Sequence, residues 1–174
     1  MDSETRHIAC FGTRSGLDWQ FIGDPVMGGH SSGAVDPVDA ETSLFHGDVS
    51  LANGGGFASV KADIRVDLGE FSGLWLHVCG DGQRYKVGLR MTSERNAPVY
   101  QQAFATRANE WQQISLPFSG FVATLRGKYL PHTRALSPSR IASLSLFISE
   151  RQAGPFALYL RNIDAYREAS IRRH

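Results

Sequence analysis

The sequence lacks the features that mark secreted or membrane-spanning proteins. Among its 174 residues there are two cysteines, Cys10 and Cys79, which are too few for a disulfide framework and favour a reducing compartment. No apolar run approaches the roughly 20 residues that a membrane-spanning helix needs. The first residues have neither the basic nor the apolar region of a secretory signal. We therefore expect a cytoplasmic protein without direct membrane insertion.

An excess of charge of either sign is absent as well. The chain carries 18 basic and 17 acidic side chains, which gives a formal net charge of +1. No long-range field therefore favours nucleic acid or an anionic membrane as a partner. The six histidines form no pair at metal-ligand spacing, and the aspartates are scattered. We expect neither a metal site nor a cofactor.

Signatures of catalysis are also missing. The chain has no G-x-S-x-G nucleophile motif and no recognisable arrangement of a nucleophile with a base. The glycine run at residues 54–56 leads into a strand-like segment, whereas phosphate-binding loops lead into the N-terminus of a helix. The sequence therefore predicts a protein that is not an enzyme.

Short segments of alternating apolar and polar residues are the main positive feature, and helical periodicity is scarce. A helical turn is expected only near residues 137–142. The expected strands are residues 19–22, 43–51, 58–66, 73–79, 84–91, 99–105, 111–116, 144–149 and 156–166, with a weaker one near 33–38. This pattern predicts an all-β fold, an antiparallel β-sandwich of the jelly-roll type. We expect one domain over residues 1–174, with a core at about 19–166 and a short tail at each end.

The strongest local signal lies at residues 73–91. Two alternating segments are separated there by Gly80-Asp81-Gly82. Asp-Gly between alternating strands favours a β-hairpin, because the turn needs residues with positive φ. We therefore expect strands 73–79 and 84–91 to pair with each other.

Outward-pointing side chains of this expected hairpin suggest a ligand groove. Trp75 and His77 alternate outward from one strand, Arg84 and Lys86 from the other, and Trp111 supplies a second aromatic ring. On the concave face of a jelly roll such groups suit a sugar, a carboxylate or a peptide. In the alternative interpretation the aromatic side chains pack under a loop and the basic ones are merely solvated.

Two glycine-dense loops, at residues 23–33 and 53–57, indicate a surface built largely from backbone. Glycine permits positive φ and close approach of another chain. Such loops either close strand connections or receive a ligand. For Ser31 and Asn53, hydrogen bonds within their own turns are the simpler explanation.

Several sequence blocks together resemble the complex I intermediate-associated protein 30 family. They are DPVMGGHS at residues 24–31, NGGGFASV at 53–60, GDGQRY at 80–85, WQ at 111–112, LPF at 116–118, RG at 126–127 and QAGPF at 152–156. The resemblance runs from about residue 19 to residue 166. It implies a galactose-binding-domain-like jelly roll, in agreement with the strand pattern. It also implies relatives that act as chaperone-like assembly factors for respiratory NADH:ubiquinone oxidoreductase (complex I), and it supplies no catalytic residues.

Two functional hypotheses follow. The first is a protein-binding assembly factor whose partners are complex I subunits or assembly intermediates, with membrane association only through such a partner. Its expected surface comprises Asp24, Met27, Gly28, Gly29, Ser31, Asn53, Gly55, Arg84, Tyr85 and Arg126. Asp24 and Arg126 would supply polar recognition, including as a charge pair, and Met27 an adaptable apolar contact. The second is a carbohydrate- or small-ligand-binding module that uses a concave groove with Trp75, His77, Arg84, Lys86 and Trp111.

Overall fold

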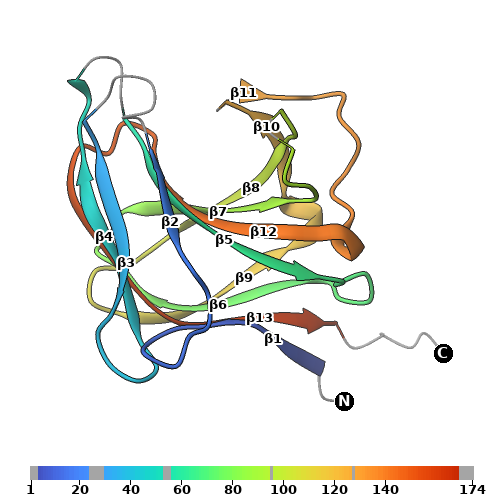
Figure 1. The fold of residues 1–174 in the computed structure, drawn as a ribbon, viewed down its shortest axis with the longest axis horizontal. Coiled ribbons are helices and arrows are strands. Elements are labelled where there is room, and N and C mark those ends of the chain that lie inside the picture. The colour runs from blue at the N-terminus through green and yellow to red at the C-terminus, as the bar shows by residue number, and fades with distance from the viewer. Residues whose placement is uncertain (1–3, 24–29, 53–55, 95, 127, 169–174) are drawn as a thin grey trace.

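The structure is a computed structural model of the chain, and it describes residues 4–23, 30–52, 56–94, 96–126 and 128–168. Two antiparallel β-sheets pack face to face (Figure 1). No α-helix occurs within these ranges, in agreement with the predicted all-β fold. Among the described helices, none is long and apolar enough to cross a membrane.

The first sheet is organised around the long strand β13, which lies at its centre. Its order is β3 (Ser32–Pro37), β4 (Ser43–Val49), β13 (Gly154–Arg167), β6 (Gly73–Cys79) and β9 (Trp111–Pro117). β1 (Glu4–Cys10) pairs with the C-terminal half of β13, beyond the point where β4 ends. The sequence analysis assigned residues 4–10 to a tail, but Ala9 of this strand is buried in the core.

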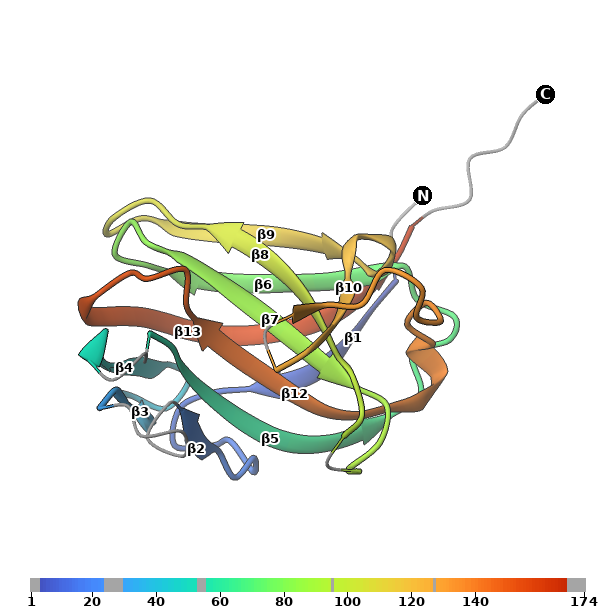
Figure 2. The ribbon, with the colours of Figure 1, turned by 90° about the horizontal axis from the view of Figure 1, so that it is seen from above.

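The second sheet is curved and carries the edge strands β11 and β2. Its order is β11 (Lys128–Tyr129), β10 (Val122–Leu125), β8 (Val99–Ala105), β7 (Arg84–Arg90), β12 (Ile141–Ile148), β5 (Ala58–Val66) and β2 (Gln20–Gly23). Figure 1 shows this sheet rising at β2 on one side and at β10 and β11 on the other. Figure 2 looks down onto its outer face, with β5, β12 and β7 in the middle.

The core lies between the two sheets and follows the alternation in the sequence. Leu74, Leu76 and Val78 of β6 are buried, as are Leu158 and Leu160 of β13. The second sheet contributes alternate residues of β5, β7 and β12 from the opposite side. A side-chain period of two places each strand's apolar residues on one face, so the predicted inner faces are confirmed.

The 3₁₀ helices η3 (Phe118–Gly120) and η4 (Pro138–Arg140) stand in connections between strands. The second lies where the sequence predicted a helical turn. Ser137 is its N-cap residue but makes no capping side-chain hydrogen bond, while Pro138 occupies the first turn. Proline is pre-organised for that position because its φ is fixed.

The predicted central hairpin is wrong, because β6 and β7 belong to different sheets. β6 pairs with β9 and β13, while β7 pairs with β8 and β12. Gly82 does have a positive φ of 93°, as the turn signal requires, but the turn carries the chain across the sandwich. The local turn chemistry was therefore predicted correctly and the pairing was not.

Candidate functional site

Most of the glycine-loop surface predicted from the sequence lies outside the described residues. This applies to Asp24, Met27, Gly28, Gly29, Asn53 and Gly55. Ser31, at the described edge of the first loop, is buried. Its Oγ accepts a hydrogen bond from the Ser50 backbone N–H at 2.9 Å. Ser31 therefore supports the local structure, and its predicted place on the contact surface is wrong.

The remaining residues of that predicted surface differ in exposure. Tyr85 is 1% exposed and packs against Phe45, Phe104 and Phe156 in the core, so it cannot contact a partner. Burial raises the pKa of the Tyr85 phenol far above its ordinary value, and the nearby Asp81 carboxylate raises it further.

Arg84 and Arg126 are exposed, and each has a neighbour that orients it. Arg84 Nε lies 3.4 Å from Glu150 Oε1. Arg126 has a φ of 52° at the β10–β11 connection, and its Nη2 donates to Asn96 Oδ1 at 3.2 Å. Arg126 and Gly23, the last residue of β2, lie toward opposite edges of the second sheet, on its two raised sides (Figure 1).

The second predicted surface, the groove of the supposed hairpin, divides between the two sheets. Trp75, His77 and Trp111 point outward from β6 and β9 of the first sheet, whereas Arg84 and Lys86 belong to β7 of the second. Because the sheets face each other across the core, these five side chains cannot line one groove. The rings of Trp75 and Tyr166 meet edge to face, with centroids 5.6 Å apart, so Trp75 packs against the neighbouring strand β13 and not under a loop.

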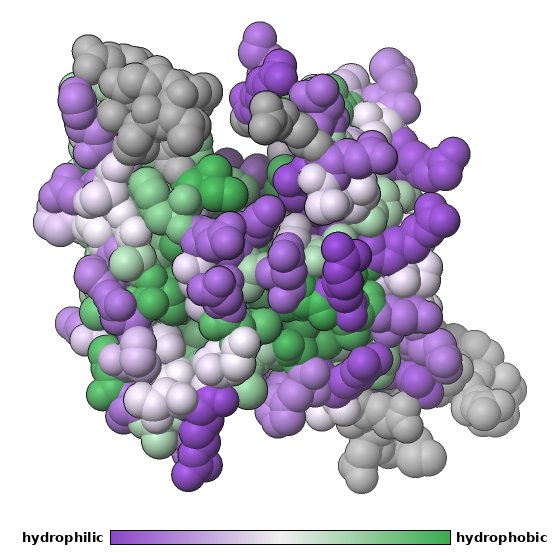
Figure 3. All heavy atoms as spheres, viewed as in Figure 1, coloured by the Kyte–Doolittle hydropathy of each residue, from purple (hydrophilic) through white to green (hydrophobic). Residues whose placement is uncertain are grey.

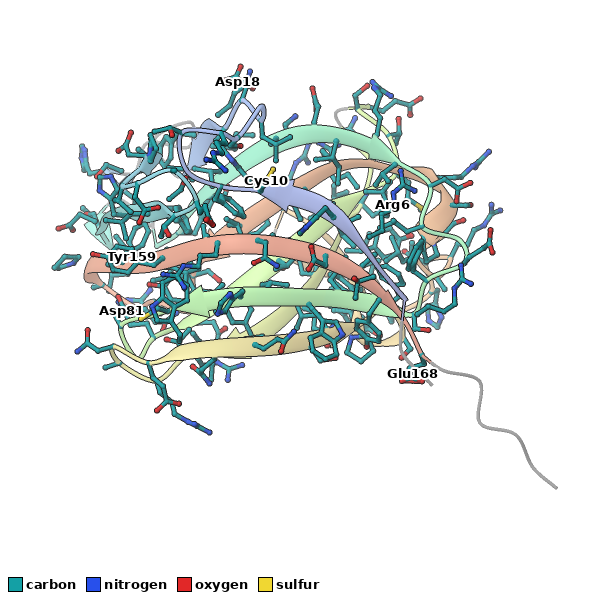
Figure 4. All side chains as sticks on the ribbon, turned by 90° about the horizontal axis from the view of Figure 1, so that it is seen from below. Arg6, Cys10, Asp18, Asp81, Tyr159 and Glu168 are labelled. Atoms are coloured by element: carbon teal, nitrogen blue, oxygen red, sulfur yellow. The ribbon has the colours of Figure 1, made fainter. Side chains whose placement is uncertain are left out.

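On the outer face of the first sheet, His77 and Trp111 come together with a residue that the sequence analysis left out of both surfaces. The ring centroids of His77 and Trp111 are 5.1 Å apart. The guanidinium carbon of Arg161 lies 4.3 Å from the centroid of the Trp111 ring. Figure 4 shows this face from below and labels Tyr159, which is 39% exposed, on the same strand as Arg161.

A β-bulge brings Arg161 to this position. The register of β13 with β6 shifts between Leu160 and Asn162, so Arg161 is the extra residue. A bulge re-aims a side chain and bends its strand. Strict alternation does place Arg161 outward, but its contact with Trp111 crosses β6 and depends on the order β13-β6-β9.

The outer face of the second sheet is concave, because the sheet rises at both of its edges (Figure 1), and we call this face the trough. Across the middle of this sheet, Lys61, Ser145, Gly88 and Gln101 lie side by side in register. Figure 3, viewed as in Figure 1, shows that hydrophilic side chains predominate at the upper right of the molecule. At one edge, Lys61 and Asp63 line a hollow of about 200 Å³ together with Gln20 and residues 16–18.

Two polar atoms in this trough have no hydrogen-bond partner. Ser143 is paired in register with Arg90 on β7, and both point to the outer face. The hydroxyl of Ser143, a residue that is 3% exposed, and Nε of Arg90 are both buried and unpaired. The Arg90 guanidinium is fixed at its other end, where Nη2 donates to the Glu94 backbone carbonyl. Unpaired buried polar atoms are uncommon and call for an explanation.

Two histidines each lie beside a carboxylate. His7 Nδ1 lies 2.5 Å from Asp164 Oδ1, and His46 Nε2 lies 2.7 Å from Asp36 Oδ2. Over the described ranges, no group of three or more His, Cys, Asp or Glu side chains is placed to hold a metal ion.

The sandwich is similar to solved carbohydrate-binding modules. A family 11 module from Clostridium thermocellum, solved in complex with a β-1,3-1,4-mixed-linked tetrasaccharide, matches with a TM-score of 0.70 and 13% identity, over 94% of this chain and 97% of its own. A family 30 carbohydrate-binding module matches with a TM-score of 0.58 and 17% identity, over 95% and 99%. At these identities the likeness concerns the fold alone, and it agrees with the predicted galactose-binding-domain-like jelly roll.

Several proteins similar to this chain in sequence share one name. The mouse protein named complex I intermediate-associated protein 30, mitochondrial, is 29% identical over 145 residues, which cover 81% of this chain and 43% of the mouse protein. A Caenorhabditis elegans protein, named as a probable member of the same kind, is 26% identical over 97% of this chain and 56% of its own length. The chain thus spans about half the length of these relatives. The family model for complex I intermediate-associated protein 30 matches residues 10–160, and the chain belongs to that family.

Proposed function

We propose that the chain is a non-catalytic binding protein that assists assembly of respiratory NADH:ubiquinone oxidoreductase. The observation that carries this proposal is the family match over residues 10–160, which includes strands of both sheets. The relatives matched in mouse and C. elegans are named after complex I intermediates. The partners of this chain would be subunits or assembly intermediates of that complex.

The contact surface proposed for this role is the glycine-loop surface predicted from the sequence. Along the chain, Asp24, Met27, Gly28 and Gly29 fall between β2 and β3, Asn53 and Gly55 fall between β4 and β5, and Arg126 follows β10. Arg84 is exposed on the same sheet. Ser31 and Tyr85 are left out because they are buried.

Affinity purification from the native host tests this proposal. The tagged protein is captured in mild detergent, and its partners are quantified by mass spectrometry for the wild type, Asp24→Ala, Arg126→Ala and Glu41→Ala. Glu41 is an exposed carboxylate of the first sheet's connections and serves as the matched control. We expect respiratory-complex subunits to be enriched and then lost in the first two variants only. If none is enriched with the wild type, the assembly role is wrong.

Location is part of the same proposal. The relatives compared above are named as mitochondrial proteins, or as probable ones. For this chain we propose a cytoplasmic protein that reaches a membrane through its partner. Fractionation of the native host, with and without that partner, checks this directly.

A second candidate function is binding of a small polyhydroxylated ligand in the trough. It is favoured by the two unpaired polar atoms, Ser143 Oγ and Arg90 Nε, whose side chains point to the outer face of the second sheet. A ligand hydroxyl can accept from the guanidinium and pair with the serine. Calorimetric titration with the mixed-linked tetrasaccharide is the test. Saturable binding that is lost in Gln101→Ala but kept in Gln113→Ala, on the other sheet, would support it.

A further inference from the structure

The Arg161 guanidinium is held from two sides on the outer face of the first sheet. Its Nε donates to Thr42 Oγ1 at 3.3 Å. Its guanidinium carbon lies 4.3 Å from the centroid of the Trp111 ring. The Trp111 ring also contacts the His77 ring, with their centroids 5.1 Å apart. An arginine fixed by a hydrogen bond and a cation–π contact loses less side-chain entropy when it binds a further group.

The charge of this guanidinium is not neutralised by an ion pair. None of the ion pairs formed within the described ranges includes Arg161, and no hydrogen bond from its two terminal nitrogens is found there. The hydrogen bond from the Glu41 backbone N–H is the largest cause of the lowered pKa of the Asp39 carboxyl, and the nearby Arg161 charge contributes only a minor part. Asp39 Oδ1 already accepts from the backbone N–H groups of Glu41 and Thr42.

Exposed aromatic surface surrounds this unpaired charge. Trp111 is 37% exposed and Tyr159 is 39% exposed. The two residues are aligned across the sheet, because Cys79 of β6 pairs in register with both of them. Trp, Tyr and Arg are the residue types that carry most of the energy at protein interfaces.

We propose that Arg161 and Trp111, with Tyr159 and His77 beside them, form a docking site for an acidic side chain of a protein partner. The free edge of a guanidinium presents two parallel N–H groups that match the two oxygens of a carboxylate. The Trp111 and Tyr159 rings then cover an apolar residue next to that carboxylate. The occupant is thus a segment with Asp or Glu beside an apolar side chain. This inference rests on the proposed binding role and names the chemistry of the partner.

A peptide titration followed by NMR tests the site without any respiratory subunit. The probe is the peptide acetyl-Ala-Glu-Leu-Glu-Ala-amide, and its match has both glutamates replaced by glutamine. The reporter is the indole N–H resonance of Trp111, assigned by its disappearance in Trp111→Phe. We expect a saturable shift with the acidic peptide and at least about tenfold weaker binding of the glutamine peptide.

Substitutions of Arg161 test whether the acidic peptide binds at this residue. Arg161→Met keeps an unbranched apolar stem over Trp111 and removes the charge, so binding should be lost while thermal unfolding stays near that of the wild type. Arg161→Lys keeps the charge without the planar pair of donors and should bind more weakly than the wild type. Arg140→Met, at an exposed arginine of the 3₁₀ helix η4 that belongs to neither proposed surface, is the matched control and should bind normally.

The outcomes that overturn the inference are distinct. The inference is wrong if both peptides give equal shifts or if the acidic peptide gives no saturable shift. It is also wrong if Arg161→Met binds the acidic peptide as well as the wild type does. Inorganic phosphate that displaces the peptide at equal concentration would show a general anion site in place of a protein-docking site. If the peptide binds but no respiratory subunit is captured, the site is supported and the assembly role is wrong. If subunits are captured but the peptide does not bind, the site is wrong and the assembly role is unaffected.

Discussion

Asp81 illustrates how one side chain can fix a corner of the sandwich. Its Oδ1 accepts from the Gln83 backbone N–H at 3.1 Å and from the Tyr85 hydroxyl at 3.0 Å. Its Oδ2 accepts from Gln83 Nε2 at 2.8 Å and from the Ala157 backbone N–H at 2.9 Å. Ala157 lies in β13 of the first sheet and Tyr85 in β7 of the second, so the carboxylate joins the two sheets where the chain crosses between them.

We expect Asp81→Ala to lower the free energy of unfolding by about 3 kcal/mol. Several donors would lose a charged acceptor in a partly buried corner, and each unmade bond of this kind costs about 1–3 kcal/mol. Urea unfolding followed by tryptophan fluorescence measures the change. Asp63→Ala, an exposed carboxylate with no hydrogen bond or ion pair in the described structure, is the control and should stay within about 0.5 kcal/mol. Equal effects of the two substitutions would contradict the role of Asp81.

Because Tyr85 and Tyr100 are buried, we expect the folded protein to lose stability at alkaline pH. Burial raises the pKa of Tyr85 and of Tyr100 above the usual value. The folded state therefore keeps these protons where an unfolded tyrosine, with a pKa of about 10, loses them. Stability from this source is complete below about pH 10 and falls as the pH rises further, with a limiting slope of about 1.4 kcal/mol per pH unit for a tyrosine that stays protonated in the folded state.

Replacing one phenol isolates its share of that pH dependence. Tyr85→Phe should be less stable than the wild type at pH 7 by about 1 kcal/mol, because the bond to Asp81 is lost. Its stability should then fall less steeply between pH 10 and pH 11.5, with Tyr100 still contributing. Urea unfolding at a series of pH values gives both slopes. The same slope for both proteins would exclude Tyr85 as a source of the alkaline effect.

At the scale of elements, close pairing of β3 with β4 depends on a glycine. Gly47 pairs in register with Gly33, and a Cβ at Gly47 would overlap the backbone carbonyl of Ser32. Backbone cannot move aside as a flexible side chain can. Gly16, in the connection before β2, has open space where a Cβ would stand.

We expect Gly47→Ala to destabilise the protein by about 3 kcal/mol, because β3 must shift away from β4. Gly16→Ala should change stability by less than about 1 kcal/mol, in either direction. Thermal unfolding by circular dichroism compares the two variants, and hydrogen exchange shows whether protection is lost first in β3. A similar loss for both would mean that the packing around Gly47 is looser than described.

The elements also show where prediction from sequence stops. Alternation located β5, β6, β8, β9, β12 and β13 within a few residues, because the period of two is a local property of an extended backbone. The Asp-Gly turn at residues 81–82 was equally clear, but it does not specify which strands pair. Tertiary packing placed β6 and β7 in different sheets, and with them the residues of the supposed groove.

For the molecule as a whole, the two cysteines report on the integrity of the sandwich. Cys10 of β1 is exposed and Cys79 of β6 is buried. Burial raises the pKa of the Cys79 thiol, which lowers its thiolate fraction at neutral pH and so its reactivity.

We therefore expect one thiol to react rapidly with Ellman's reagent in the folded protein and two in denaturant. In Cys10→Ser the folded protein should react only at the rate of unfolding or of local opening. The rates are read from absorbance at pH 7.5. Rapid reaction of both thiols in the native wild type would show that the outer face over β6 is open.

The sequence by itself determined the strands, the inward-facing core and the jelly-roll class, since these follow from local alternation and from turn residues. Tertiary structure alone decided that β1 completes the first sheet and that Arg161 stacks on Trp111. The last contact joins residues 50 positions apart through an intervening strand and a bulge. Its formation depends on strand order and register, which are set by the packing of the whole sandwich and by no local pattern.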